Sequence, residues 1–103
     1  MEKTANATER KYAEFKHSFT DAWENAEVQL SYRFAKPTKL EVKRMQDTVT
    51  KDSTQAARNL LLSTAHPDDK ERLLADMDNY PGIVASFSGA LMKGVGITSE
   101  LGN

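Results

Sequence analysis

The chain of 103 residues contains no cysteine. This absence excludes a disulfide scaffold, a thiol nucleophile and metal sites with thiolate ligands. The sequence has 14 Lys and Arg against 15 Asp and Glu, and the resulting net charge of −1 gives no general electrostatic attraction to nucleic acid or anionic lipid. No apolar run approaches the roughly 20 residues of a membrane span, and no signal peptide is evident. We expect a small cytosolic domain that binds neither nucleic acid nor membrane.

Residue spacing predicts a mainly α fold, a small bundle of four to five helices in a single domain over residues 8–94. Flexible tails are expected at 1–7 and 95–103. The first predicted helix runs from about Thr8 to Asn25, where apolar residues such as Phe15 and Phe19 recur every three or four positions.

Four further helices are predicted by apolar periodicity and by capping signals. Thr38 and Glu41 match a capping box, and Asp68 with Glu71 matches a second N-terminal cap. These helices are expected over residues 38–50, 53–65, 68–79 and 81–94. Their apolar stripes predict a monomer core of Leu60, Leu61, Leu73, Leu74, Ile83, Val84, Phe87 and Leu91.

One segment, residues 27–34, alternates polar and apolar side chains, which is the period of a half-buried β-strand. No second strand is evident, and a lone buried strand would leave its backbone groups unpaired. Either the segment continues the first helix, or it pairs with the same segment of another copy, which is the favoured interpretation. The predicted self-association residues are Val28, Leu30, Tyr32 and Phe34.

The sequence offers little chemistry for catalysis. His17 has only Asp21 as a partner ligand at helical spacing, and His66 is interpreted as a helix-boundary residue. The acidic pair Asp68-Asp69 fits the preference of helix N-termini for carboxylates. We therefore expect no enzyme activity, no metal and no cofactor.

Aromatic residues are concentrated between Tyr12 and Phe34, where six of them occur. A small core is not expected to bury all six together with the stripes of the later helices. Aromatic-rich surfaces are preferred contact sites, so the excess predicts a protein interface. Phe19 and Trp23 are the candidate exposed anchors.

An alternative function is a small helical DNA-binding regulator. The helices over 38–50 and 53–65 would form a helix-turn-helix whose second helix presents Gln55, Arg58 and Asn59, residue types that read base edges. The turn lacks glycine and the local excess of positive charge is small. Affinity for duplex DNA that falls steeply with salt would distinguish this function.

The order of several short motifs over residues 27–94 resembles a known family. The alternating segment ends in Phe34-Ala35-Lys36-Pro37-Thr38, a Phe-x-x-Pro-Thr pattern, and an Asn59-Leu60-Leu61 helix and a Tyr80-Pro81-Gly82 turn follow. This order is similar to that of the small tail assembly chaperones of long-tailed bacteriophages and prophages.

The resemblance implies a function in the cytoplasm of the host cell. Chaperones of this family coat the tape measure protein in many copies, keep it soluble, help recruit tail tube subunits and leave the finished particle. For this chain it implies the tape measure and tail tube proteins as partners, and we expect a homo-oligomer. Phe19 and Trp23, chosen from the aromatic excess, are the candidate client-binding residues. The turn at 80–82 is expected to set the angle between the last two helices.

Overall fold

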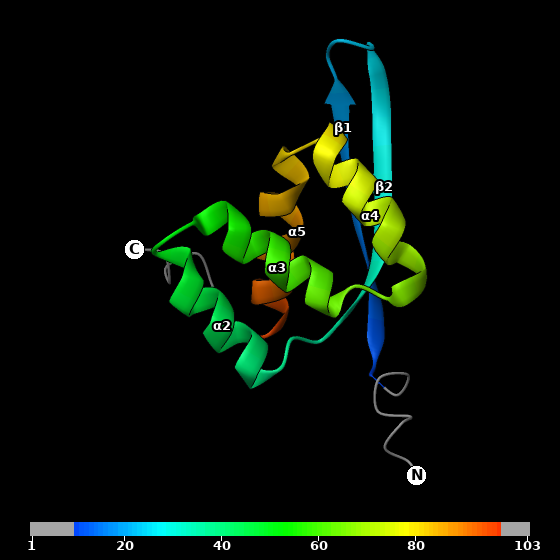
Figure 1. The fold of residues 1–103 in the computed structure, drawn as a ribbon. Coiled ribbons are helices and arrows are strands. Elements are labelled where there is room, and N and C mark those ends of the chain that lie inside the picture. Colours follow the sequence, from blue (N-terminus) through cyan, green and yellow to red (C-terminus); the bar gives the residue numbers. More distant parts are fainter. Residues whose placement is uncertain (1–9, 98–103) are drawn as a thin grey trace.

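The computed structural model describes residues 10–97 and shows a mixed α/β fold that is mostly helical. A two-stranded antiparallel hairpin is followed by four helices, and its tip extends beyond them (Figure 1). The elements are β1 (Tyr12–Asp21), β2 (Ala26–Ala35), α2 (Lys39–Val49), α3 (Ser53–Thr64), α4 (Pro67–Asn79) and α5 (Gly82–Gly94). The four predicted later helices and the predicted extended segment are confirmed.

The helix predicted over residues 8–25 is wrong where the structure describes it, because β1 occupies most of that segment. Phe15 and Phe19 are four residues apart, and a spacing of four fits one face of a strand as well as one face of a helix. The residue that distinguishes the two patterns is His17, which also faces inward and packs its ring 5.9 Å from that of Phe87. Because histidine is not counted as apolar, a pattern of apolar residues alone misses the alternation of this strand.

The tight turn between the strands also follows from the sequence. The Asp21 carboxylate accepts hydrogen bonds from the backbone N–H groups of Trp23, at 3.0 Å, and Glu24, at 3.1 Å. Asn25 adopts a φ of 53°, a backbone region that Asn tolerates better than most residues. An Asp at the start of the loop and an Asn at its end therefore close the hairpin.

The premise that the chain holds no second strand is wrong, and pairing of residues 27–34 between copies stays a prediction. The whole of β2 pairs with β1 of the same chain, from Tyr12 opposite Ala35 to Asp21 opposite Ala26. The partner strand is β1, which lies within the segment expected to be helical.

The helix termini are largely those that the sequence predicts. Thr38 and Glu41 form the expected capping box of α2, and the Asp52 side chain caps α3. The predicted cap of α4 by Asp68 is wrong: the His66 ring accepts the hydrogen bond from the Asp68 backbone N–H, at 3.1 Å. His66 is thus a helix-boundary residue, as expected.

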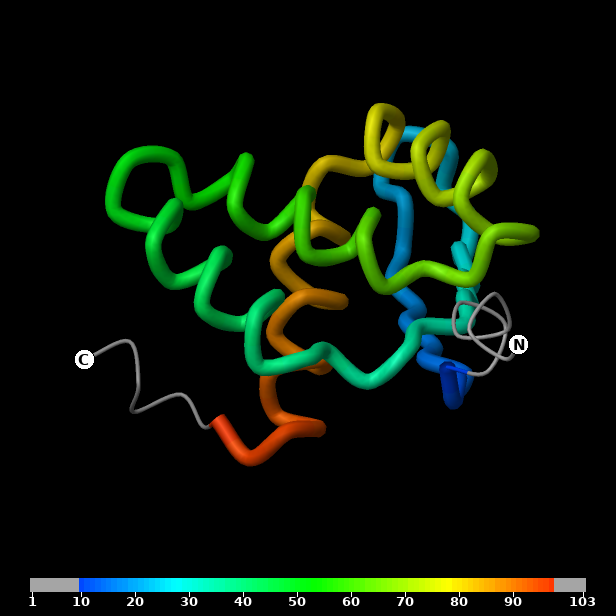
Figure 2. Tube along the Cα trace, turned by 60° about the horizontal axis from the view of Figure 1, so that its bottom comes forward, coloured from blue at the N-terminus to red at the C-terminus, as the bar shows by residue number. Residues whose placement is uncertain are grey.

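The helices pack on one another and on the inner face of the hairpin. In Figures 1 and 2 α5 lies between β1 and the pair formed by α2 and α3. The predicted core is confirmed except for Leu74, which is 38% exposed on α4. The buried hydrophobic cluster comprises Tyr32, Phe34, Leu60, Leu61, Ala65, Leu73, Met77, Ile83, Val84, Phe87, Leu91 and Met92.

A polar network joins the outer side of β2 to α4. Asp69 is buried and accepts hydrogen bonds from the Arg33 backbone N–H, at 2.8 Å, and from the Arg33 guanidinium, at 2.9 and 3.0 Å. Arg72 lies 3.2 Å from Asp69, donates to the Ser31 carbonyl and stacks over the Tyr32 ring. The hydrogen bonds from Arg33, together with the charges of both arginines, hold the pKa of Asp69 well below its usual range.

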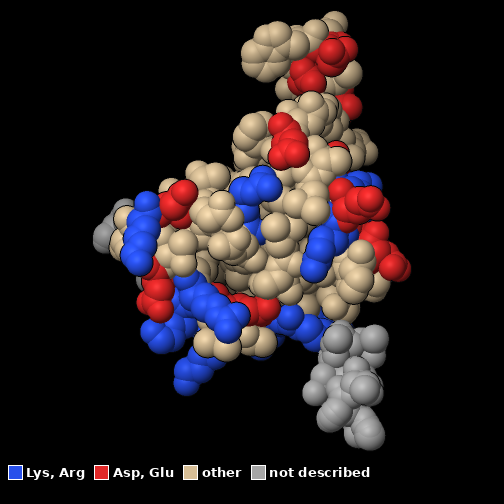
Figure 3. Space-filling model, viewed as in Figure 1, with Lys and Arg blue, Asp and Glu red and all other residues tan. Residues whose placement is uncertain are grey.

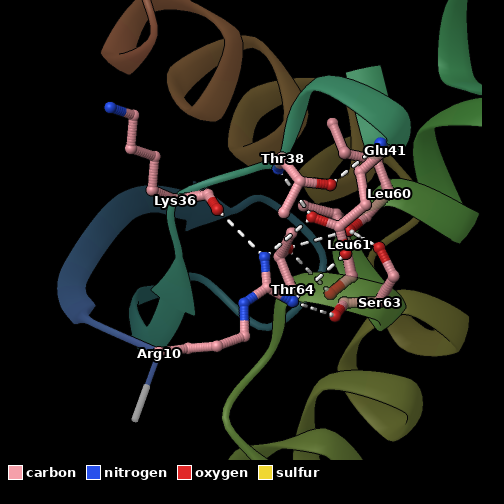
Figure 4. Close-up of polar contacts among 8 residues, drawn as sticks. All are labelled: Arg10, Lys36, Thr38, Glu41, Leu60, Leu61, Ser63 and Thr64. Atoms are coloured by element: carbon pink, nitrogen blue, oxygen red, sulfur yellow. Dashed lines mark hydrogen bonds and ion pairs between the residues drawn. The ribbon is translucent and has the colours of Figure 1, made fainter. Parts of the chain in front are cut away.

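A second polar cluster holds the start of β1 against α2 and α3. Figure 4 shows the Arg10 side chain reaching the Glu41 carboxylate, at 2.8 Å, and the Lys36 and Ser63 carbonyls. Burial opposes the ionisation of Glu41, but hydrogen bonds from Arg10 and the Thr38 backbone lower its pKa below the ordinary value. The hairpin base is therefore fixed by charge-assisted hydrogen bonds on two sides.

The predicted tail at 1–7 lies outside the described residues. Of the predicted tail at 95–103 the structure describes 95–97, in which the Ile97 backbone N–H donates to the Met92 carbonyl at 2.9 Å. No helix within residues 10–97 is long and apolar enough to cross a membrane.

Candidate protein-binding site

A surface hollow of about 570 Å³ lies where the hairpin tip meets the junction of α4 and α5. We call it the tip hollow. Its lining includes Phe19, Asp21, Trp23, Tyr80, Pro81 and Ile83. The two candidate anchors predicted from the sequence, Phe19 and Trp23, are therefore brought to one site.

The wall of the tip hollow is an aromatic contact between the hairpin and the helices. The alternation of β1 turns Phe19 inward, where its ring meets that of Tyr80 edge to face at 5.0 Å. Tyr80 is the C-cap of α4, and Pro81 directly after it is the N-cap of α5. The Tyr80 hydroxyl lies 3.3 Å from the Asp21 carboxylate. These contacts hold the two sides of the hollow at a defined distance.

Trp23 lies in the hairpin loop at the rim of the hollow and is 93% exposed. A tryptophan is highly buried on average, and one that is 93% exposed beside an apolar hollow is a candidate contact residue. The loop that carries it is held by the two hydrogen bonds to Asp21. Trp23 is thus presented to solvent by a structured turn.

The rim of the tip hollow carries acidic side chains. Burial, the charge of Asp21 and its hydrogen bond, and the charges of Glu24 and Asp76 raise the pKa of Tyr80. The carboxylates of Asp21, Glu24 and Asp76 thus all favour the protonated form of the Tyr80 hydroxyl. Figure 3 shows carboxylates and uncharged side chains over the hairpin tip, whereas Lys and Arg on this face lie over the body below it.

The four predicted self-association residues all lie on the inner face of β2. Tyr32 and Phe34 are 1% exposed in the core, and Leu30 packs half-buried against it. Val28 is also half-buried, opposite Phe19 in the hairpin register. Their alternation reflects packing within the monomer, so in this fold Tyr32 and Phe34 are not available to a second copy.

The remaining candidates from the sequence are separate from the tip hollow. On α3, Gln55 donates to Asn59, and the Arg58 guanidinium lies 3.9 Å from Asp78. No group of three His, Asp or Glu side chains within residues 10–97 is arranged to hold a metal ion. Among the described residues, the tip hollow is the place where predicted binding residues meet.

Sequence reasoning missed the helical half of this site. The sequence predicts a structural role for the turn at 80–82, but it does not predict that Tyr80 packs against Phe19. Asp21 and Tyr80 are 59 residues apart in the chain, and no local pattern indicates that they meet. A correct assignment of β1 would have placed Phe19 on the inner face, but not opposite this turn.

Comparison with known proteins shows the family of the chain. A family described as a domain of unknown function, DUF6848, matches residues 10–102. The chain belongs to the DUF6848 family. No protein of curated function matches it. The DUF6848 chain is similar to the solved structure of an uncharacterised protein, rbstp2171, from Bacillus stearothermophilus, with a TM-score of 0.70 and 21% sequence identity. That match covers 93% of this chain and 91% of the other, and at this identity it concerns the fold.

Proposed function

We propose that the protein is a tail assembly chaperone of a long-tailed phage or prophage. It binds the tape measure protein, keeps it soluble and helps to recruit tail tube subunits, acting by apolar contact and without a cofactor or catalysed reaction. The motif order over residues 27–94, which is similar to that of tail assembly chaperones, supports this proposal. The observation that carries the binding function is the fully exposed Trp23 beside Phe19 at the tip hollow.

The tip hollow suits an apolar client. Tape measure proteins of such phages are long amphipathic helices, and apolar side chains of a helix bind by insertion into apolar hollows. Tryptophan and tyrosine are enriched among the residues that dominate binding energy at interfaces. Phe19 and Tyr80 supply a fixed wall, and Trp23 supplies a large side chain that a client can cover.

In this proposal several copies act on one client, in the host cytoplasm, and leave before the particle is finished. The copies would then associate with one another as well as with the client. Sedimentation at tens of micromolar is expected to show species heavier than the 11.5 kDa monomer. A strictly monomeric protein would contradict the proposed self-association.

The function is tested by co-expression with the product of the neighbouring reading frame, which the proposal requires to be a long helical tape measure protein. We expect the tape measure protein to remain in the supernatant with the wild type and to precipitate with Trp23→Ala. Leu74→Ala is the matched control, because it removes another exposed apolar side chain that lies outside the hollow. Equal precipitation with and without the wild-type chain would contradict the proposed function.

A further inference from the structure

The residues that line the tip hollow lie within two longer segments, 17–32 and 75–91, that carry charge of one sign. Residues 17–32 contain Asp21, Glu24 and Glu27, and residues 75–91 contain Asp76 and Asp78. Neither segment contains a lysine or an arginine. The rest of the chain is therefore net positive, since the whole protein has a net charge of only −1.

Of these carboxylates Asp21 lines the hollow, and Glu24 and Glu27 lie beside lining residues. Asp78 already lies 3.9 Å from the Arg58 guanidinium. Asp21 contacts the Tyr80 hydroxyl from the hairpin side, and Asp76 accepts the hydrogen bond of the Tyr32 hydroxyl on the α4 side. Glu24 lies in the same exposed loop as Trp23, and Glu27 accepts from Thr20, which lines the hollow. A cation that enters this site would meet carboxylates and the faces of Trp23 and Tyr80, both of which attract positive charge.

We propose that the tip hollow binds a client segment in which an apolar side chain is flanked by Lys or Arg. The apolar side chain fills the space between Phe19 and Trp23, and the flanking cations pair with the carboxylates of the rim. This deepens the proposed function by stating the chemistry of the client segment, and it rests on that function only for the identity of the client. A segment flanked by Asp or Glu is rejected by like-charge repulsion.

A second copy of the chain is the competing occupant. Its α2 exposes Leu40, which is 55% accessible, next to Lys39, Lys43 and Arg44. The Lys43 ammonium, however, already lies 3.2 Å from the Asp47 carboxylate of the same helix. The pairing of Lys43 makes α2 a weaker match for the rim than a segment whose cations are all unpaired. The proposal therefore commits to a segment of another protein, and a second copy is one outcome of the test.

The single tryptophan of the chain makes the experiment direct, because fluorescence excited selectively at tryptophan reports on Trp23 alone. The probes are two synthetic amphipathic helices with the same leucine face, one with lysines and one with glutamates on the polar face. We expect a saturable blue shift with the lysine peptide at moderate salt, and affinity about tenfold or more weaker for the glutamate peptide. Equal binding of both peptides, or no shift with either, would overturn the proposal.

Two charge reversals test whether the preference for the lysine peptide comes from the carboxylates at the tip. Glu24→Lys at the tip is expected to weaken lysine-peptide binding about tenfold. Glu14→Lys makes the same change on β1 about 20 Å away along the strand, and it is expected to leave binding unchanged. If both variants bind like the wild type, the rim carboxylates do not select the ligand and the proposal fails. Circular dichroism confirms that both variants fold.

The remaining outcomes separate the occupants and the two proposals. A blue shift that develops with protein concentration alone, and that Leu40→Asp abolishes, would overturn the proposal in favour of a second copy. Lysine-peptide selectivity without any effect on the tape measure protein would sustain this inference and contradict the proposed function. If the wild type and Glu24→Lys keep the tape measure protein in solution equally well, the proposed function is sustained and this inference is contradicted.

Discussion

The two ends of the hairpin differ in how they are held. At the base, Arg10 and Asp69 each make several charge-assisted hydrogen bonds to neighbouring elements, and Tyr32 and Phe34 are buried. At the tip, the contacts to the helices are the edge-to-face packing of Phe19 on Tyr80 and one hydroxyl–carboxylate contact, and Trp23 is exposed.

This difference separates the residues that stabilise the fold from those that are free to bind. Charge-assisted and bidentate hydrogen bonds fix an element in one position, and a buried aromatic cluster adds apolar burial. A large exposed aromatic adds little to the stability of the monomer. We therefore expect substitutions at the base to change the free energy of unfolding, and substitutions at the tip to change binding.

The largest effect is expected for Phe87→Ala, at the centre of the cluster into which the hairpin packs. The Phe87 ring lies 5.2 Å from that of Tyr32, 5.8 Å from that of Phe34 and 5.9 Å from that of His17. Its removal leaves a cavity and should lower the free energy of unfolding by about 3–5 kcal/mol. Urea denaturation measures the change. A loss close to zero would show that the hairpin does not depend on this cluster.

The next effect is expected for Asp69→Asn, which removes the charge that binds Arg33 and Arg72. We expect a loss of about 2 kcal/mol at neutral pH, as for other hydrogen bonds to charged groups. The carboxylate has a folded-state pKa below its ordinary value of 3.8, so its stabilisation is present above about pH 4 and is lost as the pH falls further.

The acid limb of a stability profile tests this assignment. The wild type should lose stability more steeply than Asp69→Asn as the pH falls below about 4. Parallel profiles of the two proteins would contradict the role of this ion pair at the hairpin base.

A smaller effect is expected for Tyr32→Phe, which removes the hydroxyl that donates to Asp76. The loss at neutral pH should be about 1–2 kcal/mol, because Asp76 loses this partner. Burial, followed by the hydrogen bond to Asp76, raises the pKa of Tyr32 above its ordinary value of 10.0. The folded protein thus keeps a proton that the unfolded chain loses, and stability should fall above about pH 10. Tyr32→Phe should show a flatter alkaline limb in thermal unfolding, and an equally steep limb would assign the effect to other groups.

The smallest effect on stability is expected at the tip. Trp23→Ala should change the free energy of unfolding by less than about 0.5 kcal/mol, because the side chain makes few contacts within the monomer. The same substitution should weaken binding of the lysine peptide about tenfold or more. The peptide is titrated with a fluorescent label, since the variant has no tryptophan. A destabilisation as large as that of Asp69→Asn would remove the contrast between tip and base.

The helices were predictable because their signals are local. The capping box at Thr38 and Glu41 and the apolar stripe of Ile83, Phe87 and Leu91 each lie within a few turns of one helix. The strand over 27–34 was predictable for the same reason, since its side chains alternate without interruption.

The first strand and the candidate site were not predictable in this way. The spacing of Phe15 and Phe19 fits both periods, and the inward-facing residue between them is polar. The turn residues Asp21 and Asn25 gave a local signal for a hairpin that apolar periodicity alone does not use. The contact of Phe19 with Tyr80 depends on tertiary packing, which no local pattern specifies.

The central claim, that the hairpin tip is the binding region, is tested most directly by hydrogen–deuterium exchange of the chain with and without the tape measure protein. We predict that the backbone amides of residues 19–24 and of Tyr80, Gly82 and Ile83 gain protection, while those of the hairpin base do not change. Protection along α2 with no change at the tip would contradict the account.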